Sequence, residues 1–225
     1  MPTDASFEAL REAIVRGYIA PDARLVEADI GAAFDMSRGA VRTALIRLEQ
    51  EGLVVREPHR GARVRRVTDE EAIEILQARA VLEGLAARQA AERIEDAGAE
   101  RLRARLARQR ELLEAGDLLA ASDANADLHA TLLELSGHAT ACRLIRSLSS
   151  QTVRYQYRTI LLPGRAAASL REHTAIVEAV AAGRPDEAEA AMRAHLFNVA
   201  RAVQRRALPG GIDQASRGVL EGGAR

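Results

Sequence analysis

The sequence predicts a mainly α-helical protein, in which a small N-terminal unit of three helices and two strands precedes an all-α helical bundle. Apolar residues recur at helical spacing through most of the 225 residues, and strand-like patterns occur only near residues 53–67. Ala, Leu, Arg and Glu dominate, and only 3% of residues are aromatic, which favours helices. We expect domains at residues 1–66 and 67–207. The Gly-rich residues 208–225 should form a mobile tail.

The N-terminal unit begins with an expected helix at residues 6–17, which places Phe7 and Ile14 on one face and stops at Gly17. A Pro-Asp turn follows, and then a short helix carries Ile30 and Phe34.

Ser37 is a good N-cap for the third helix, expected at about residues 38–50 and ended by Gly52. "LVVRE", "PHRG" and "ARVRRV" then read as strand, turn and strand. Three helices and a two-stranded ribbon within about 65 residues are typical of a winged helix-turn-helix domain.

Charge is unevenly distributed along a chain whose formal net charge is zero. Residues 38–66 carry eight Arg and three Glu, a local net charge of +5. Arg38 and Arg42 begin the third helix, where a recognition helix reaches base edges, and arginine suits bidentate contact with guanine. The bland alternative is a solvated, Arg-rich helix face. The predicted DNA-binding residues are Ser37, Arg38, Gly39, Arg42, Arg47, and at the wing His59, Arg60 and Gly61.

These residues resemble the GntR family of bacterial transcription regulators. The family's usual Ser-Arg-Thr-Pro-Val-Arg-Glu-Ala-Leu stands here as "SRGAVRTAL", followed by Arg47-Leu48 and Gly52-Leu53-Val54. The upstream Pro-x-x-Arg-Leu-x-Glu element is present from Pro21 to Glu27. The resemblance covers about residues 7–66 and implies a double-stranded DNA operator, near-palindromic and read by a homodimer.

The second region is helix-periodic from Thr68 to about residue 206 and predicts about six helices. "TDEE" has the form of a capping box and opens the first of them. The expected breaks are Asp96-Ala97-Gly98, Gly116-Asp117, Gly137-His138, Pro163-Gly164 and Gly183-Arg184-Pro185.

Polar residues interrupt the apolar stripes of three of these helices. Asn125 and His129 lie one turn apart on one face, and His173 and His195 each align with apolar neighbours. Arg184 is eleven residues from both His173 and His195, so an antiparallel hairpin brings the two imidazoles face to face about 16 Å from its turn. A lone buried histidine is usually a hydrogen-bonded core residue. Three histidines in facing stripes, with an amide oxygen beside them, favour a divalent metal site.

This region resembles the FadR-like branch of the GntR family, which carries an all-helical FCD domain, over about residues 70–206. The resemblance depends on "RAVLEGLA" from Arg79, "NADLH" from Asn125, "EHTAI" from Glu172 and "MRAH" ending at His195. It implies that Asn125, His129, His173 and His195 hold a metal at the floor of a cavity for a small organic acid. Asn stands where Asp is common in the family. Arg79, Arg154 and Arg165 resemble cavity cations that pair with the acid, the alternative for each being an ordinary salt bridge.

We therefore predict a ligand-responsive DNA-binding regulator, expected to be a repressor, with a small carboxylate effector. Its divalent transition metal would be zinc in the first place, or nickel or another ion. A metal-dependent enzyme and a regulator with a metal-free structural His cluster are the alternatives, and the chain lacks a His-Glu-x-x-His motif. A single cysteine, with no secretory signal or membrane span in the sequence, predicts a cytoplasmic protein.

Overall fold

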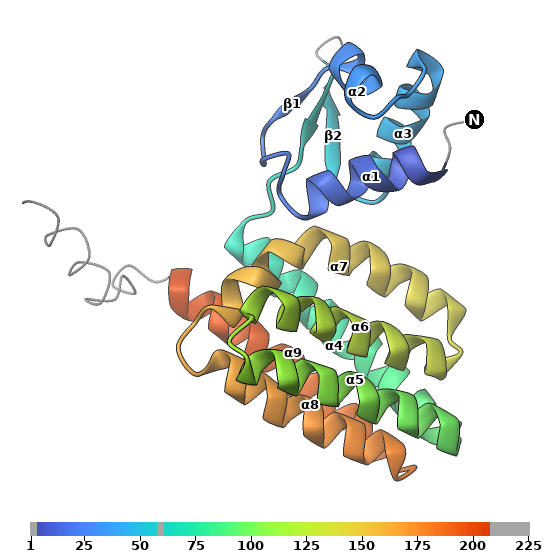
Figure 1. Cartoon of the computed structure of the whole chain (residues 1–225), viewed down its shortest axis with the longest axis vertical. Coiled ribbons are helices and arrows are strands. Elements are labelled where there is room, and N and C mark those ends of the chain that lie inside the picture. Colours follow the sequence, from blue (N-terminus) through green and yellow to red (C-terminus); the bar gives the residue numbers. More distant parts are fainter. Residues whose placement is uncertain (1–3, 58–60, 208–225) are drawn as a thin grey trace, which may run out of the picture.

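The computed structural model describes residues 4–57 and 61–207, which form two lobes (Figure 1). The smaller lobe contains α1 (Asp4–Val15), β1 (Arg24–Leu25), α2 (Glu27–Ala33), α3 (Arg38–Gln50), β2 (Val54–Glu57) and β3 (Gly61–Val64). The larger lobe contains α4 (Asp69–Glu92), α5 (Asp96–Glu114), α6 (Leu118–Ser136), α7 (Ala139–Ile160), α8 (Arg165–Ala181) and α9 (Pro185–Ala207). The predicted fold class is confirmed. The predicted tail lies outside the described residues.

The sheet of the small lobe has three strands rather than the predicted two, in the order β1-β3-β2. The strand missed by the prediction is β1, which pairs antiparallel with β3 through Arg24 opposite Arg63 and Leu25 opposite Ala62. Two residues are too few to show the alternation of apolar and polar side chains that identifies a strand. The β2–β3 hairpin was predicted, although β3 ends at Val64 instead of Val67.

The recognition helix α3 is held by its cap and by its apolar face. Ser37 accepts a hydrogen bond from the Ala40 amide at 3.3 Å, which satisfies one of the free N–H groups of the first turn. Val41 and Leu48 are fully buried in the core of the small lobe. Gly52 ends the helix at φ +71°, a left-handed conformation that glycine adopts without strain.

Six helices form the larger lobe in the described residues, as the periodicity predicts. Thr68 caps α4 by accepting a hydrogen bond from the Glu71 amide at 3.2 Å, and Gly137 and Pro185 lie at the expected helix ends. One predicted break is wrong, because Asp96 begins α5 and the chain turns at residues 93–95. Gly98 is a packing position. A Cβ added there would lie 3.0 Å from a methyl group of Leu135 on α6.

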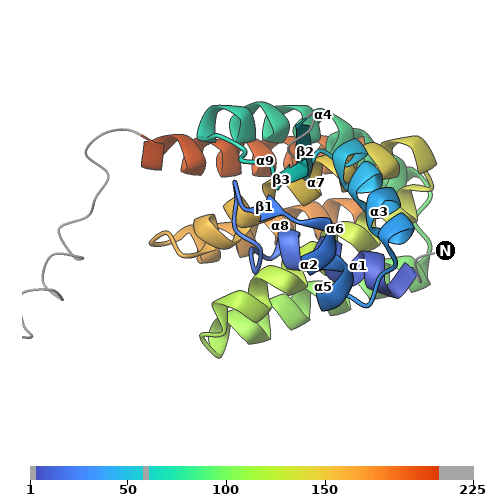
Figure 2. The ribbon, with the colours of Figure 1, turned by 90° about the horizontal axis from the view of Figure 1, so that it is seen from above.

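Seen from above, α4 and α9 lie side by side along one edge of the bundle, and the α5–α6 hairpin lies along the opposite one (Figure 2). The helix α8 packs against both α5 and α9. In this arrangement, α6, α8 and α9 each have a face that borders the same part of the bundle interior. None of the described helices is long and apolar enough to cross a membrane.

Candidate functional site

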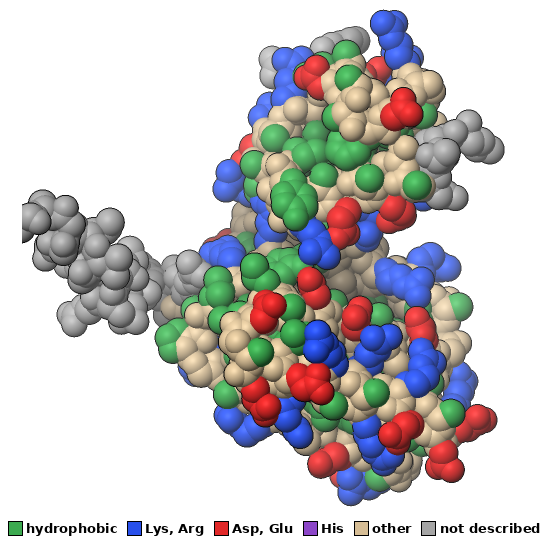
Figure 3. Space-filling model, in the orientation of Figure 1, with side chains coloured by type: hydrophobic (Ala, Val, Ile, Leu, Met, Phe, Trp, Pro, Cys, Tyr) green, Lys and Arg blue, Asp and Glu red, His purple; other side chains and the backbone are tan. Residues whose placement is uncertain are grey.

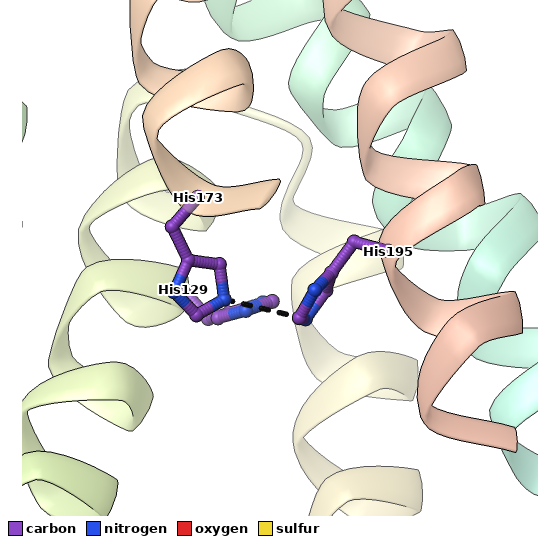
Figure 4. A group of neighbouring side chains, drawn as sticks. All are labelled: His129, His173 and His195. Atoms are coloured by element: carbon purple, nitrogen blue, oxygen red, sulfur yellow. Dashed lines mark hydrogen bonds between the residues drawn. The ribbon is translucent and has the colours of Figure 1, made fainter. Parts of the chain in front are cut away.

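Three imidazoles meet inside the bundle, each from a different helix: His129 on α6, His173 on α8 and His195 on α9 (Figure 4). The Nε2 atoms of His173 and His195 are 3.3 Å apart, and one nitrogen from each of the three rings lies within 4.8 Å of the others. The antiparallel α8–α9 hairpin therefore brings His173 and His195 face to face, as the equal spacing from Arg184 predicts.

The outer nitrogen of each ring has its own acceptor. His129 Nδ1 is 2.7 Å from Glu83 Oε2, His195 Nδ1 is 2.7 Å from Glu172 Oε2, and His173 Nδ1 is 2.8 Å from Gln109 Oε1. Carboxylate and carbonyl oxygens only accept hydrogen bonds, so each Nδ1 carries the proton. Every Nε2 is then unprotonated, and its lone pair is directed at the centre of the cluster. This Nδ1–H tautomer is the one that binds metals through Nε2.

The charge states agree with this assignment. Burial lowers the pKa of His195 to about 4, against the opposing effect of its bond to Glu172, and burial lowers the pKa of His173 well below its usual value. For Glu83, burial acts to raise the pKa, but the charge of Arg79 and the hydrogen bonds from Arg79 and His129 outweigh it and hold the pKa at about 2. Neutral His173 and His195 rings and an ionised Glu83 carboxylate are the states required of ligands and their supports.

The side-chain oxygen of Asn125 is a further hydrogen-bond acceptor at this site. Asn125 Oδ1 is buried and has no hydrogen-bond partner in the described residues. A buried oxygen without a partner costs about 1–3 kcal/mol. Among the described residues, the site thus presents three imidazole nitrogens and one orphaned oxygen.

These residues fit a divalent metal. Tetrahedral zinc bonded to nitrogen at about 2.0–2.1 Å sets two such ligands about 3.3 Å apart, which is the separation of the His173 and His195 nitrogens. Three imidazoles and a neutral oxygen suit zinc, nickel and other borderline metals.

A cavity of about 60 Å³ opens above the cluster and is lined in part by Asn125, His129 and His195. Two predicted effector cations, Arg79 and Arg165, line it as well. Each is already bonded to a glutamate that supports a histidine: Arg79 donates to Glu83 at 2.7 Å and Arg165 to Glu172 at 2.8 Å. The site therefore contains two Arg–Glu–His chains that approach its centre from opposite helices.

The third predicted cation, Arg154, does not line this cavity. Its guanidinium donates to the Ile19 carbonyl at 3.2 Å and packs near Gly17, at the junction of the two lobes. The resemblance to the FCD domain implied a cavity cation at this position, but the side chain leaves α7 toward the small lobe. Its position argues against the predicted effector role.

In the small lobe, which is called the reader lobe from here on, Arg38 is the exposed first residue of α3, and it has no ion-pair partner among the described residues. Arg42 is exposed too and pairs with Glu27 of α2 at 3.0 Å, which holds it over the start of the recognition helix. Gly39 lies between them with open space around it. Gly61 begins β3 at φ +87°, and His59 and Arg60 lie outside the described residues.

Arg47 was predicted to contact DNA, but its guanidinium lies 3.6 Å from the ring centroid of Phe7 in a cation–π contact. It lines a hollow between the lobes together with Arg11 and Glu51. Arg47 follows the start of α3 by about two and a half turns, which places its side chain on the opposite face of the helix, toward the bundle.

The prediction also missed the three acceptors that orient the histidines. Each left a signal. Glu83 interrupts the buried alanine face of α4, Gln109 lies three residues after Leu106 on the buried face of α5, and Glu172 precedes His173 directly. A polar residue in an apolar stripe, on a helix facing the histidines, is the pattern of a supporting ligand.

A winged-helix reader joined to a helical bundle with a ligand-type histidine cluster defines a DNA-binding transcription regulator. Residues 3–64 match the bacterial regulatory proteins of the gntR family, and residues 74–198 match the FCD domain. The chain belongs to the GntR family and carries an FCD domain.

Its relatives share this class. The chain is 28% identical over 199 residues to the HTH-type transcriptional repressor RspR of Escherichia coli, covering 88% of this chain and 87% of that protein. It is 29% identical over 187 residues to a probable D-xylose utilization operon transcriptional repressor of Paenarthrobacter nicotinovorans, covering 81% and 80%. These are transcription regulators and not enzymes, as predicted.

Solved structures show the same fold. A putative GntR regulator from Rhodococcus sp. RHA1 matches with a TM-score of 0.73 and 27% identity, over 92% of this chain and 100% of that one. McbR/YncC of E. coli matches with a TM-score of 0.77 and 20% identity, over 91% and 98%.

Proposed function

We propose that this regulator is a repressor that binds a near-palindromic operator as a homodimer and responds to a small carboxylate held at a divalent metal. The cluster of three imidazole nitrogens, two of them from residues that line the same cavity as the orphaned Asn125 oxygen, supports this proposal most directly. The relatives reported above are named as a repressor and a probable repressor, which supports the sign of regulation.

Asn125, His129, His173 and His195 would hold the metal. The bound ion would supply a Lewis-acidic position at the floor of the cavity, to which a carboxylate oxygen binds. The cavity's own cations, Arg79 and Arg165, lie beside that position and donate to carboxylates in bidentate geometry. Because the cavity is small, the acid should be a compact one.

The helix α7 provides a path from the cavity to the reader. On one side, Thr152 accepts a hydrogen bond from Arg79 at 3.2 Å. On the other, Gln151 accepts one from Arg65 at 2.9 Å, and Ser150 bonds to Arg11 of α1. A ligand that moves Arg79 therefore acts on the helix that supports the small lobe. It shifts operator affinity only as far as it prefers one lobe arrangement over the other.

DNA binding is tested by fluorescence anisotropy with a duplex from the promoter of the chain's own gene. We expect saturable binding that weakens with salt, and weaker binding by Arg38→Ala. Arg110→Ala is the matched control, since Arg110 is exposed on α5 in the other lobe. Absence of binding to this duplex at low salt, in both the metal-loaded and the chelator-treated protein, would contradict the proposal.

Metal binding is tested by elemental analysis of protein purified without chelator. We expect about one transition-metal ion per chain, lost in His173→Ala. A substoichiometric content unaffected by this substitution would favour the alternative of a metal-free structural His cluster.

A further inference from the structure

Another hollow, distinct from the one beside Arg47 and larger than the histidine cavity, lies at the waist where the two lobes meet, and arginine side chains lie beside that waist (Figure 3). Its volume is about 310 Å³, compared with about 60 Å³ for the cavity over the histidines. That volume is within the range of small-molecule sites. The metal site does not account for this hollow, because Tyr155 is the one residue that lines both.

Both lobes and the segment between them build the walls. Val15 and Leu53 come from the reader lobe, Arg65 and Arg66 from the connecting segment, and Arg154 from α7. A molecule bound here would touch all three parts. The shape of the hollow therefore depends on how the lobes are arranged.

Four arginines line the hollow, and three of them have carboxylate partners. Arg65 pairs with Glu71, Arg66 pairs with Asp22, and Arg158 lies 3.4 Å from Asp69. The four arginines and three acids leave a formal charge of +1.

The arginine without a carboxylate is Arg154. Its hydrogen bond in the described residues goes to the Ile19 carbonyl. Its side chain is partly buried, and burial together with the positive charge of Arg66 lowers its pKa. A half-buried guanidinium beside another cation is stabilised by an anion. Its planar N–H groups match two oxygens of a carboxylate or phosphate.

We propose that this junction hollow binds a small oxyanion, carried by a carboxylate or a phosphate group, through Arg154. The bound anion fastens the reader lobe to α7. The binding is linked to lobe arrangement, so the anion favours this arrangement over any in which the lobes separate. The site is a second regulatory input, separate in position from the metal site.

The experiment is isothermal titration of the full chain with inorganic phosphate and, separately, with acetate, at constant ionic strength set by chloride. Constant ionic strength separates site binding from the general stabilisation that phosphate exerts on proteins. We expect saturable binding of at least one of the two, and their relative affinities assign the group. Arg154→Gln should weaken binding about 10-fold or more, and the exposed Arg110→Gln should change it less than twofold.

Arg165→Gln distinguishes this hollow from the metal cavity, because Arg165 lines only the latter. It should leave phosphate binding unchanged, and any acetate binding that is lost in Arg165→Gln but kept in Arg154→Gln belongs to the metal cavity. Far-UV circular dichroism verifies the fold of each variant, and Arg66→Gln replaces Arg154→Gln if the latter does not fold. No saturable binding by the wild type, unchanged binding by the folded junction variant, or loss of binding in Arg165→Gln alone would overturn the proposal. None of these outcomes depends on DNA or metal binding.

Discussion

Replacing Gln109 by methionine removes the hydrogen-bond acceptor that orients His173 and leaves this candidate metal ligand in place. Gln109 is 1% exposed, and its amide oxygen lies 2.8 Å from His173 Nδ1. Methionine has a similar length and no comparable acceptor. The Nδ1–H group of His173 then loses its partner, and the ring gains by moving its proton to Nε2, from which it reaches the bare His195 Nε2 at 3.3 Å.

That proton must leave before a metal binds. Removing the support of a ligating histidine typically lowers metal affinity 10- to 100-fold, or about 1.4–2.7 kcal/mol. The free energy of unfolding of the metal-free variant should fall by only about 1 kcal/mol, because the new His–His bond replaces the lost one.

The assay is competition for Zn²⁺ against a chromophoric chelator, with chemical denaturation of the metal-free protein measured in parallel. Gln77→Met is the matched control, since Gln77 is exposed on α4. It should leave both quantities unchanged. A zinc dissociation constant of Gln109→Met within twofold of the wild-type value would refute the reasoning.

Three further predictions concern the metal and the reader. Zinc at 100 times its dissociation constant should raise the free energy of unfolding by about 2.7 kcal/mol, and a chelator titration of His195→Ala should show no such gain; an equal gain there would place the metal elsewhere. Asn125→Asp should tighten zinc binding in the same competition assay while destabilising the metal-free protein, because an added buried carboxylate has no partner without the ion; weaker zinc binding would exclude this position as a ligand. Arg38→Ala should cost about 1–3 kcal/mol of operator binding and reduce discrimination against a mutated operator, whereas equal losses on all duplexes would indicate a phosphate contact.

The course of the helices could be predicted because it depends on local signals. The Thr68 hydroxyl caps the start of a helix, and Gly137 ends one in a left-handed conformation, and both residue types do so in many proteins. The break expected at Gly98 failed for a non-local reason. That glycine is required by the close approach of Leu135, a residue 37 positions further along the chain. The two-residue strand β1 likewise exists only through its pairing with β3.

In the candidate site, too, some features follow from local sequence and others depend on contacts between distant helices. His173 and His195 could be placed face to face because the turn between them fixes their depth in a hairpin. Gln109 and Glu83 come from α5 and α4, and their pairing with particular histidines depends on how those helices pack. Arg154 shows the limit most clearly, since its neighbours on α7 line the cavity while its own side chain turns to the other lobe.

The position of α7 between two hollows links these observations. Thr152 and Tyr155 line the histidine cavity, and Tyr155 also lines the junction hollow, where its hydroxyl lies 3.1 Å from the Val67 carbonyl and 2.8 Å from Asp69. Burial and the Asp69 carboxylate raise the pKa of Tyr155 to about 12, so the hydroxyl keeps its proton and its bond to the segment that connects the lobes. A change on either side of α7 must then be accommodated by the same tyrosine. Because a packed core deforms in discrete steps, ligands in the two hollows would compete or cooperate through one helix, and separate paths to the reader are unnecessary.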